Sequence, residues 1–287
     1  MFGECHAHLV MDGFNYKKAI ARYKNGIEDE LIRRDLKAYH DAGVRFIRDG
    51  GDNLGVSKRA AELAPEYEID YRTPIFAIHK RGYYGAIVGT AFDTMKEYVL
   101  RVKEVKKAKG HFIKIMTTGI MDFDHHGVIT GPKLSSEWVR EMVHIAHSEG
   151  FAVMTHVNGA ESIEIALAAG VDSIEHGNFM NDTCLKMLKE TGAVWVPTIA
   201  IVGNIIGSGR FDDHILKAIF NQQRDNIKKA FDNDACIALG SDAGAYCVPH
   251  PQGIFDEYRY FKEMIKDKKV LDCRLMMAEE KIKKTFL

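Results

Sequence analysis

Short apolar runs alternate with longer amphipathic stretches along almost the whole chain. The runs are bounded by glycine or polar residues, a pattern typical of strands that are buried on both faces, as in a parallel sheet. We predict strands over residues 2–9, 45–47, 74–78, 112–116, 152–155, 171–175, 194–200 and 237–239. Between them apolar residues recur at helical spacing, which predicts helices over residues 28–42, 56–66, 92–109, 135–149, 160–169, 182–191, 212–234, 254–268 and 272–285.

Eight predicted strands that alternate with helices favour an α/β fold, the (β/α)8 TIM barrel. We expect residues 1–287 to form one barrel domain. An open, doubly wound sheet is the alternative, but it would leave two strand edges to protect. No G-x-G-x-x-G motif follows a predicted strand, so the dinucleotide-binding form of that fold lacks its signature.

The composition excludes several classes of protein. The 287 residues include 39 Lys and Arg and 40 Asp and Glu, giving a net charge of −1, and 46% are hydrophobic. A chain of this kind can form a core, and without a basic block it is not expected to bind nucleic acid. No run approaches the roughly 20 apolar residues of a membrane helix. The first residues do not resemble a secretory signal, so we expect a cytoplasmic protein with no membrane partner.

The number and spacing of the cysteines agree with a cytoplasmic protein. The five cysteines are widely spaced, and no C-x-x-C motif occurs. This pattern predicts reduced, mostly buried thiols rather than a disulfide framework or a cysteine-rich zinc site.

Side chains that bind metals stand at the ends of several predicted strands, where the active site of such a barrel lies. His6 and His8 end the first strand and are two residues apart, so they point to the same side. His156, His176 and Asp242 end the fifth, sixth and eighth strands. Together these nitrogen and oxygen ligands are typical of zinc, with manganese, iron or nickel as substitutes.

Lys114 lies in the middle of the fourth apolar strand, residues 112–116. A buried ammonium is costly to desolvate, so this side chain must be paired or chemically altered. Burial is expected to lower its pKa and leave a neutral amine. Such an amine can take up carbon dioxide to form a carbamate, which converts a cation into an anionic ligand.

These strand ends resemble the amidohydrolase superfamily, in particular its binuclear branch with a carboxylated lysine. The local sequences are also similar to those of the imidazolonepropionase-like and prolidase-like group of metal-dependent peptidases. The similar stretches are VRFIRDGG (44–51), IKIMTTG (113–119), AGVDSIEHG (169–177), AVWVPT (193–198) and ALGSDAG (238–244). Imidazolonepropionase itself uses one metal and lacks the lysine of the fourth strand, so Lys114 favours the two-metal relatives.

The resemblance implies two divalent ions, which we expect to be Zn²⁺, bridged by a carbamate on Lys114 and by a hydroxide. It places His6, His8 and Asp242 on the more buried ion and the other two histidines on the more exposed one. Asp242 would take the proton of the attacking hydroxide and pass it to the leaving amine, as general base and then general acid.

The chain departs from the superfamily in one respect. Members usually carry a small β-sandwich built from residues before the first strand and after the last helix. Here the first expected ligand is residue 6 and the last residue is Leu287, so we expect a barrel that lacks the sandwich. The uncovered apolar surface would favour self-association into a homo-oligomer.

Substrate contacts are expected in the loops after the third and fourth predicted strands. His79, Arg81 and Tyr83 follow the third strand, and His125 follows the fourth. A cation in this region would bind a substrate carboxylate. An apolar pocket would instead favour a neutral ester.

The leading hypothesis is a metal-dependent enzyme that hydrolyses an amide bond in a small peptide-like molecule, a dipeptide or an N-acyl amino acid. A second reading keeps the binuclear centre but changes the substrate to a lactone, a phosphotriester or a cyclic amide, because fold and ligands do not decide between these reactions. A third is a non-catalytic barrel that acts as a structural partner, although all six expected ligands are in place.

Overall fold

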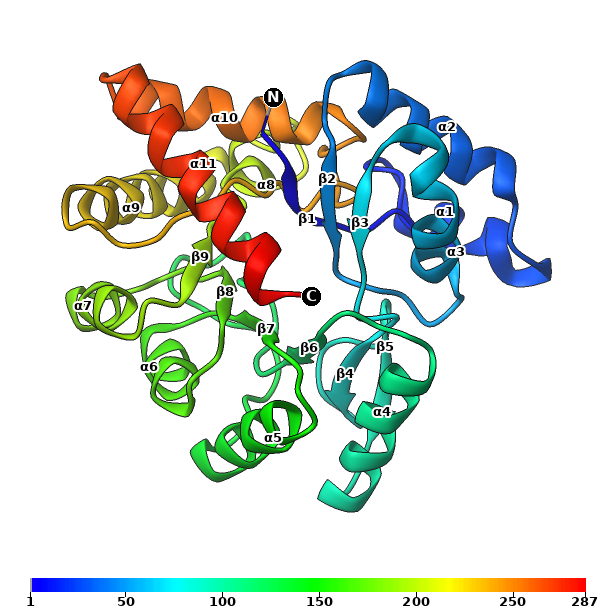
Figure 1. Ribbon diagram of the computed structural model, residues 1–287. Coiled ribbons are helices and arrows are strands. Elements are labelled where there is room, and N and C mark those ends of the chain that lie inside the picture. The colour runs from blue at the N-terminus through cyan, green and yellow to red at the C-terminus, as the bar shows by residue number, and fades with distance from the viewer. Residues whose placement is uncertain (1) are drawn as a thin grey trace.

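The computed structural model describes residues 2–287 and places the strands in the middle of a ring of helices (Figure 1). The strands are β1 (Glu4–Ala7), β2 (Phe46–Asp49), β3 (Asp70–Arg72), β4 (Ala77–Lys80), β5 (Gly89–Phe92), β6 (Ile113–Met116), β7 (Val153–Val157), β8 (Ser173–His176) and β9 (Val194–Val196). Most of their side chains are buried, as expected of strands that are covered on both faces.

The helices follow the strands in sequence and pack around them. They are α1 (Tyr16–Arg22), α2 (Asp29–Asp41), α3 (Val56–Leu63), α4 (Met95–Lys107), α5 (Ser136–Ser148), α6 (Ala160–Ala169), α7 (Asp182–Thr191), α8 (Ala200–Gly203), α9 (Asp213–Asp232), α10 (Gln252–Met264) and α11 (Lys268–Thr285). Side-chain caps set several starts. The Thr94 side chain accepts a hydrogen bond from the Glu97 N–H, so α4 begins at Met95 rather than at the predicted residue 92.

The strands pair in parallel in two sheets, of order β1-β2-β3 and β5-β4-β6-β7-β8-β9. Residues 236–243 join the sheets on one side. The Trp195 N–H donates to the Cys236 carbonyl (2.9 Å), and the Cys5 N–H donates to the Leu239 carbonyl (3.0 Å). On the other side the Asp52 N–H donates to the Ile75 carbonyl (2.9 Å). This arrangement confirms the predicted α/β fold of the (β/α)8 type.

The third predicted strand differs most from the structure. The strand predicted over residues 74–78 is displaced to β4 (77–80), which pairs with β6 and with the unpredicted strand β5. A break separates β4 from β3, also unpredicted, which pairs with β2. The break falls at Pro74, which has no N–H to donate, and at Ile75, whose φ is 69°. The predicted strand 194–200 also ends early, because Pro197 and Thr198 (φ 51°) turn the chain into α8.

Helix α11 closes the amino-terminal end of the strands (Figure 1). Ala278, Ile282 and Phe286 pack against residues at the starts of β1, β2, β7 and β9. The Phe286 ring meets Phe112 edge-on at 5.3 Å, and the Arg48 guanidinium lies 4.5 Å from its centroid. This end of the strands is therefore packed, which leaves the opposite end for a site.

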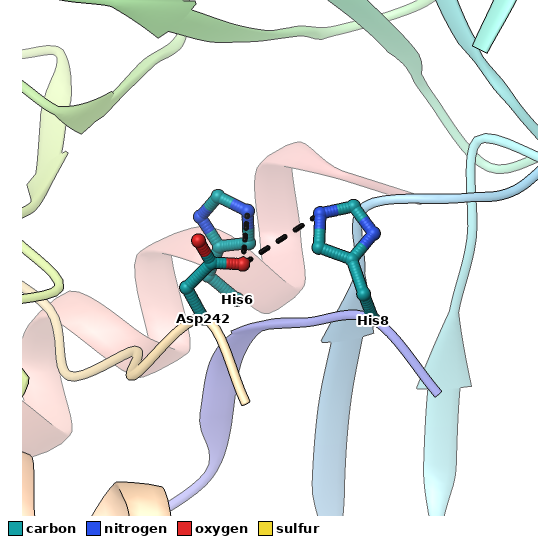
Figure 2. A group of neighbouring side chains, drawn as sticks. All are labelled: His6, His8 and Asp242. Atoms are coloured by element: carbon teal, nitrogen blue, oxygen red, sulfur yellow. Dashed lines mark ion pairs between the residues drawn. The ribbon is translucent and has the colours of Figure 1, made fainter. Parts of the chain in front are cut away.

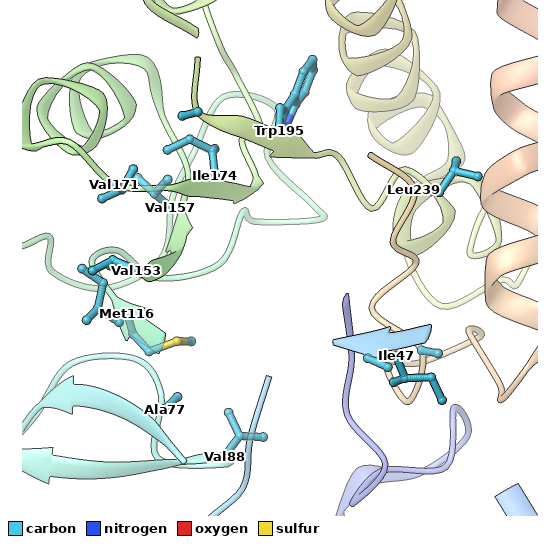
Figure 3. Close-up of a cluster of buried hydrophobic side chains, with 14 of the residues drawn as sticks. Ile47, Ala77, Val88, Met116, Val153, Val157, Val171, Ile174, Trp195 and Leu239 are labelled. Carbon is cyan, nitrogen blue, oxygen red and sulfur yellow. The ribbon is translucent and has the colours of Figure 1, made fainter. Parts of the chain in front are cut away.

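The main core lies between the strands and the surrounding helices (Figure 3). Ile47, Val153, Ile174 and Leu239 contribute to it from widely separated parts of the chain, and Trp195 is fully buried within it. Among residues 2–287, no helix has the length and apolar character needed to cross a membrane.

Candidate metal centre

The residues predicted to bind metal converge at the carboxyl ends of the strands. These residues come from β1 and the residue after it, from β6, β7 and β8, and from the segment 236–243 that joins the two sheets. All of them line one cavity of about 510 Å³: His6, His8, Lys114, His156, His176 and Asp242. Parallel strands bring their carboxyl ends to one face, which is why residues more than 200 positions apart meet here.

Three of these side chains form a compact group (Figure 2). Oδ1 of Asp242 lies 3.7 Å from Nε2 of His6 and 3.7 Å from Nε2 of His8. Both rings are buried, and the structure gives Oδ1 of Asp242 no hydrogen-bond donor. His6, His8 and Asp242 are therefore a candidate metal site, as the sequence predicted.

Three of the histidines, His8, His156 and His176, are each held by a contact to one ring nitrogen. Nδ1 of His8 contacts the Gly51 carbonyl at 3.2 Å, and Nδ1 of His176 contacts the Thr198 hydroxyl at 2.8 Å. Nε2 of His156 donates to the Gly119 carbonyl at 3.1 Å, which leaves its Nδ1 with the lone pair. Such second contacts fix the tautomer and the ring orientation of metal-binding histidines.

His6 is held by charged residues that sequence reasoning did not assign to the site. Its Nδ1 lies 2.8 Å from Oε2 of Glu175, and the other oxygen of Glu175 accepts a hydrogen bond from Arg48 at 2.8 Å. Both charged side chains are completely buried. The available signal was a charged residue inside an apolar strand, the same signal that singled out Lys114.

Lys114 is also buried, with 1% of its surface exposed, and its Nζ lies 3.1 Å from Nε2 of His6. Burial lowers the pKa of this amine, although the nearby carboxylates of Glu175 and Asp242 oppose the shift. Burial likewise raises the pKa of the Asp242 carboxyl. Without a bound cation, the centre therefore favours neutral groups.

Burial also keeps the histidines neutral. It lowers the pKa of His8 and of His156 to about 3 and that of His6 and His176 well below the usual range, and the Lys114 ammonium adds to each shift. A neutral imidazole has a free lone pair and is the form that binds metal.

The backbone at two of the predicted ligands is held in an unusual conformation. His176 and Asp242 have φ values of 64° and 58°, in the left-handed region that only a few per cent of non-glycine residues adopt. Residues with such backbone strain are concentrated at functional sites, where contacts with the surrounding fold hold the backbone in the unfavourable conformation. Gly50 leaves room for the His8 ring: a Cβ at position 50 would lie 2.3 Å from a ring atom, so no other residue fits there without a shift.

The donor set fits a divalent metal ion. With Nδ1 of each ring directed to another acceptor, Nε2 of His6 and Nε2 of His8 both face a carboxylate oxygen that lacks a donor, and Nε2 of His6 also faces Nζ of Lys114. Three acceptors that face one another at this spacing are satisfied by a cation. Histidine nitrogens with a carboxylate suit Zn²⁺ and related transition metals.

None of the four residues predicted to contact substrate lines this cavity. Arg81 is exposed and pairs with Asp93 at 2.7 Å, and His125 is exposed and contacts Asp122 at 3.0 Å. Nδ1 of His79 contacts the Lys80 carbonyl. Tyr84, the residue after Tyr83, lines the cavity, whereas Tyr83 does not.

Aromatic and aliphatic side chains form most of the cavity wall. Tyr84 packs on the His156 ring at 4.9 Å, and Phe123 stacks on Phe211 at 5.1 Å between the loops that follow β6 and α8. The sequence predicts substrate contacts in the loop after β6 but does not single out these residues, because the conformation of both loops depends on contacts between distant segments.

The family model for the amidohydrolase family matches residues 5–280 of this sequence. The chain belongs to the amidohydrolase family. The residues matched include every one of the six predicted ligands, so the family assignment and the cavity concern the same part of the molecule.

Individual curated proteins are similar to this chain at low identity. An ochratoxinase of Aspergillus niger is 26% identical over 272 residues, which cover 83% of this chain and 56% of that protein. An uncharacterized protein of Mycobacterium tuberculosis is 25% identical over 120 residues, 40% of this chain and 32% of that protein. The chain thus spans about a third to about half of the length of these curated relatives.

Solved structures share the fold. The crystal structure of a Xaa-Pro dipeptidase with bound methionine in its active site superposes with a TM-score of 0.77 and 21% identity, covering 97% of this chain and 75% of that one. This agreement over nearly the whole chain supports the barrel described above.

Proposed function

We propose that this chain is a metal-dependent hydrolase that cleaves an amide bond in a dipeptide or an N-acyl amino acid. One observation carries the proposal: His6, His8 and Asp242 bring two imidazole nitrogens and a carboxylate oxygen that lacks a donor together in a cavity at the carboxyl ends of the strands. Membership of the amidohydrolase family supports it, as do similar proteins described as an ochratoxinase and a Xaa-Pro dipeptidase.

We infer two divalent ions, with Zn²⁺ the best match to the donors. The first would bind His6, His8 and Asp242. The second would bind the two remaining histidines, and a carbamate on Lys114 would join the two sites. Bound ions of this kind polarise a carbonyl and lower the pKa of an attacking water.

The protein groups then have separate tasks. Asp242 accepts the proton of the attacking water and returns it to the leaving amine, a role for which its carboxylate is placed beside His6 and His8. Lys114 supports the carbamate because burial favours its neutral amine, the form that reacts with carbon dioxide. The apolar walls limit water around the reacting amide.

The apolar lining also favours a second candidate, hydrolysis of a neutral lactone or cyclic amide by the same centre. The two candidates differ in the charge of the substrate, so a panel of substrates separates them.

The decisive experiment combines metal analysis with hydrolysis of such a panel. Protein purified without chelator is analysed for metal and then assayed with dipeptides, N-acyl amino acids, lactones and hydantoins. We expect about two ions per chain and release of free amino acid. Metal content well below one ion per chain would refute the proposal, and turnover of lactones or hydantoins alone would establish the second candidate.

A further inference from the structure

The charged lining of the cavity outside the six ligands is entirely cationic. Within residues 2–287 it consists of Lys17 and Arg210. Neither side chain has a carboxylate within 4.0 Å among the described residues, whereas Arg81, the cation that the sequence suggested, is paired with Asp93. A cavity with unpaired cations at its wall attracts anionic substrates.

Arg210 is the better placed of the two cations to bind a carboxylate. Its guanidinium carbon lies 4.4 Å from the centroid of the Tyr246 ring and 5.2 Å from that of Phe211. Stacking on aromatic faces holds the planar group while leaving its N–H donors free, and such donors bind both oxygens of a carboxylate. The Lys17 ammonium is 6.0 Å from the Tyr16 centroid, and a point charge of this kind lacks the paired donors.

The loop that carries Arg210 is fixed across the cavity. Phe211, the next residue, stacks on Phe123 at 5.1 Å with an angle of 28° between the rings. At the loop's start the Gly207 N–H donates to the Asp213 side chain at 2.8 Å. These contacts anchor both ends of residues 207–213 and keep the guanidinium at the cavity wall.

Large apolar side chains remain uncovered around the same cavity. Phe14, Tyr16 and Tyr246 line it and are 69%, 41% and 38% exposed. Exposed apolar area of this kind around a cavity indicates an apolar ligand group rather than a fully polar one. The wall therefore combines a site for a carboxylate with a surface for an aromatic or large aliphatic group.

We propose that the substrate is an N-acyl amino acid or dipeptide with an aromatic or large aliphatic group, and that Arg210 binds its free carboxylate. This inference rests on the proposed amide hydrolysis and narrows it to anionic, apolar amides. It also replaces Arg81 as the specificity-determining cation.

The test compares two amides that differ only in the carboxylate: N-benzoyl-L-phenylalanine and N-benzoyl-phenethylamine. For the metal-loaded wild-type protein we expect kcat/KM to be about 10- to 100-fold higher for the carboxylate-bearing amide. Arg210→Met should remove most of this preference, mainly through KM, and leave the phenethylamide nearly unchanged. Arg210→Lys should restore part of it, because it keeps the charge but loses the paired donors.

Arg81→Met is the matched control, an exposed arginine whose guanidinium is held by Asp93 and does not line the cavity. It should leave both substrates unaffected. An unchanged preference in Arg210→Met, or a loss in Arg81→Met instead, would overturn the inference.

A binding measurement separates the two proposals. If the wild-type protein hydrolyses neither amide nor any other member of the panel, amide hydrolysis fails as the proposed function. Calorimetric titration with N-benzoyl-L-phenylalanine still tests the carboxylate site. Binding at least about tenfold weaker in Arg210→Met supports it, and equal or undetectable binding in both proteins overturns it.

Discussion

Nδ1 of His6 lies 2.8 Å from Oε2 of Glu175, which joins the candidate metal centre to a carboxylate on a strand that is not paired with β1. Glu175 is held in turn by Arg48, whose Nε donates to the Cys5 carbonyl at 2.8 Å, one residue from His6. The three residues form a closed connection between β1, β2 and β8. His6 therefore has little freedom to turn its Nε2 away from the centre.

Glu175→Gln should weaken metal binding by about 10- to 100-fold, because the neutral amide no longer orients His6 or strengthens it as a ligand. Competition with a chromophoric zinc chelator measures the dissociation constant, and circular dichroism checks that the variant is folded. Glu190→Gln, an exposed carboxylate on α7, is the control. An unchanged dissociation constant in folded Glu175→Gln would show that His6 needs no such support.

Lys114→Ala should lower the metal content from about two ions per chain to about one and remove most activity, because the variant cannot form a bridging carbamate. Elemental analysis gives the stoichiometry. Lys103→Ala removes an exposed lysine from α4 and should change neither property. Full activity in Lys114→Ala would exclude a bridging role.

Asp242→Asn should lower kcat by about 10²- to 10⁴-fold, since an amide of the same shape cannot accept the proton of the attacking water. The remaining ligands should still bind metal, more weakly. Steady-state kinetics at saturating metal separates the catalytic loss from the binding loss. Near-normal kcat under these conditions would mean that another group moves the proton.

The convergence of the six predicted ligands on one cavity could be predicted because each signal was local. Lys114 and Asp242 stand within or just after short apolar runs, and the barrel rule alone brings strand ends to one face. The fold was predictable for the same reason. Strand β3 was missed because it has three residues and only Tyr71 among them is buried, and β5 because Gly89 and Ala91 give little strand signal.

The side chains that line the outer cavity wall could not be predicted because their placement depends on distant segments. Arg210 faces the cavity only when its loop packs on Phe123 and Tyr246, which lie far away in sequence. Arg81 sits next to a strand end, as an active-site residue should, but Asp93 holds its guanidinium. Proximity to a strand end identifies the catalytic face, and loop packing decides which side chains reach the substrate.

Phe286→Ala should lower the free energy of unfolding by about 3–5 kcal/mol, because the ring is fully buried where α11 closes the strands. Urea unfolding of the metal-free protein measures the change. The neighbouring variant Leu287→Ala truncates a side chain that is 72% exposed and should have an effect within about 0.5 kcal/mol. Equal effects of the two variants would contradict the closure described here.

Glu257 should make the protein less stable as the pH rises. Its carboxylate is completely buried and accepts hydrogen bonds from the Ile199 N–H (3.1 Å) and the Ala200 N–H (2.7 Å). Burial outweighs these bonds and raises its pKa well above the usual 4.5. The unfolded chain therefore loses this proton first. Above about pH 4.5 the contribution of Glu257 to stability falls, at up to about 1.4 kcal/mol per pH unit, until its folded pKa is passed.

Glu257→Gln cannot ionise, so it should gain stability relative to the wild-type protein between about pH 5 and pH 7. Urea unfolding of both metal-free proteins at about pH 5, 6 and 7 measures the difference and cancels the pH dependence of all other groups. Glu263→Gln changes an exposed side chain of the same helix and should run parallel to the wild type. Parallel curves for Glu257→Gln as well would mean that Glu257 is already ionised in the folded protein at about pH 5.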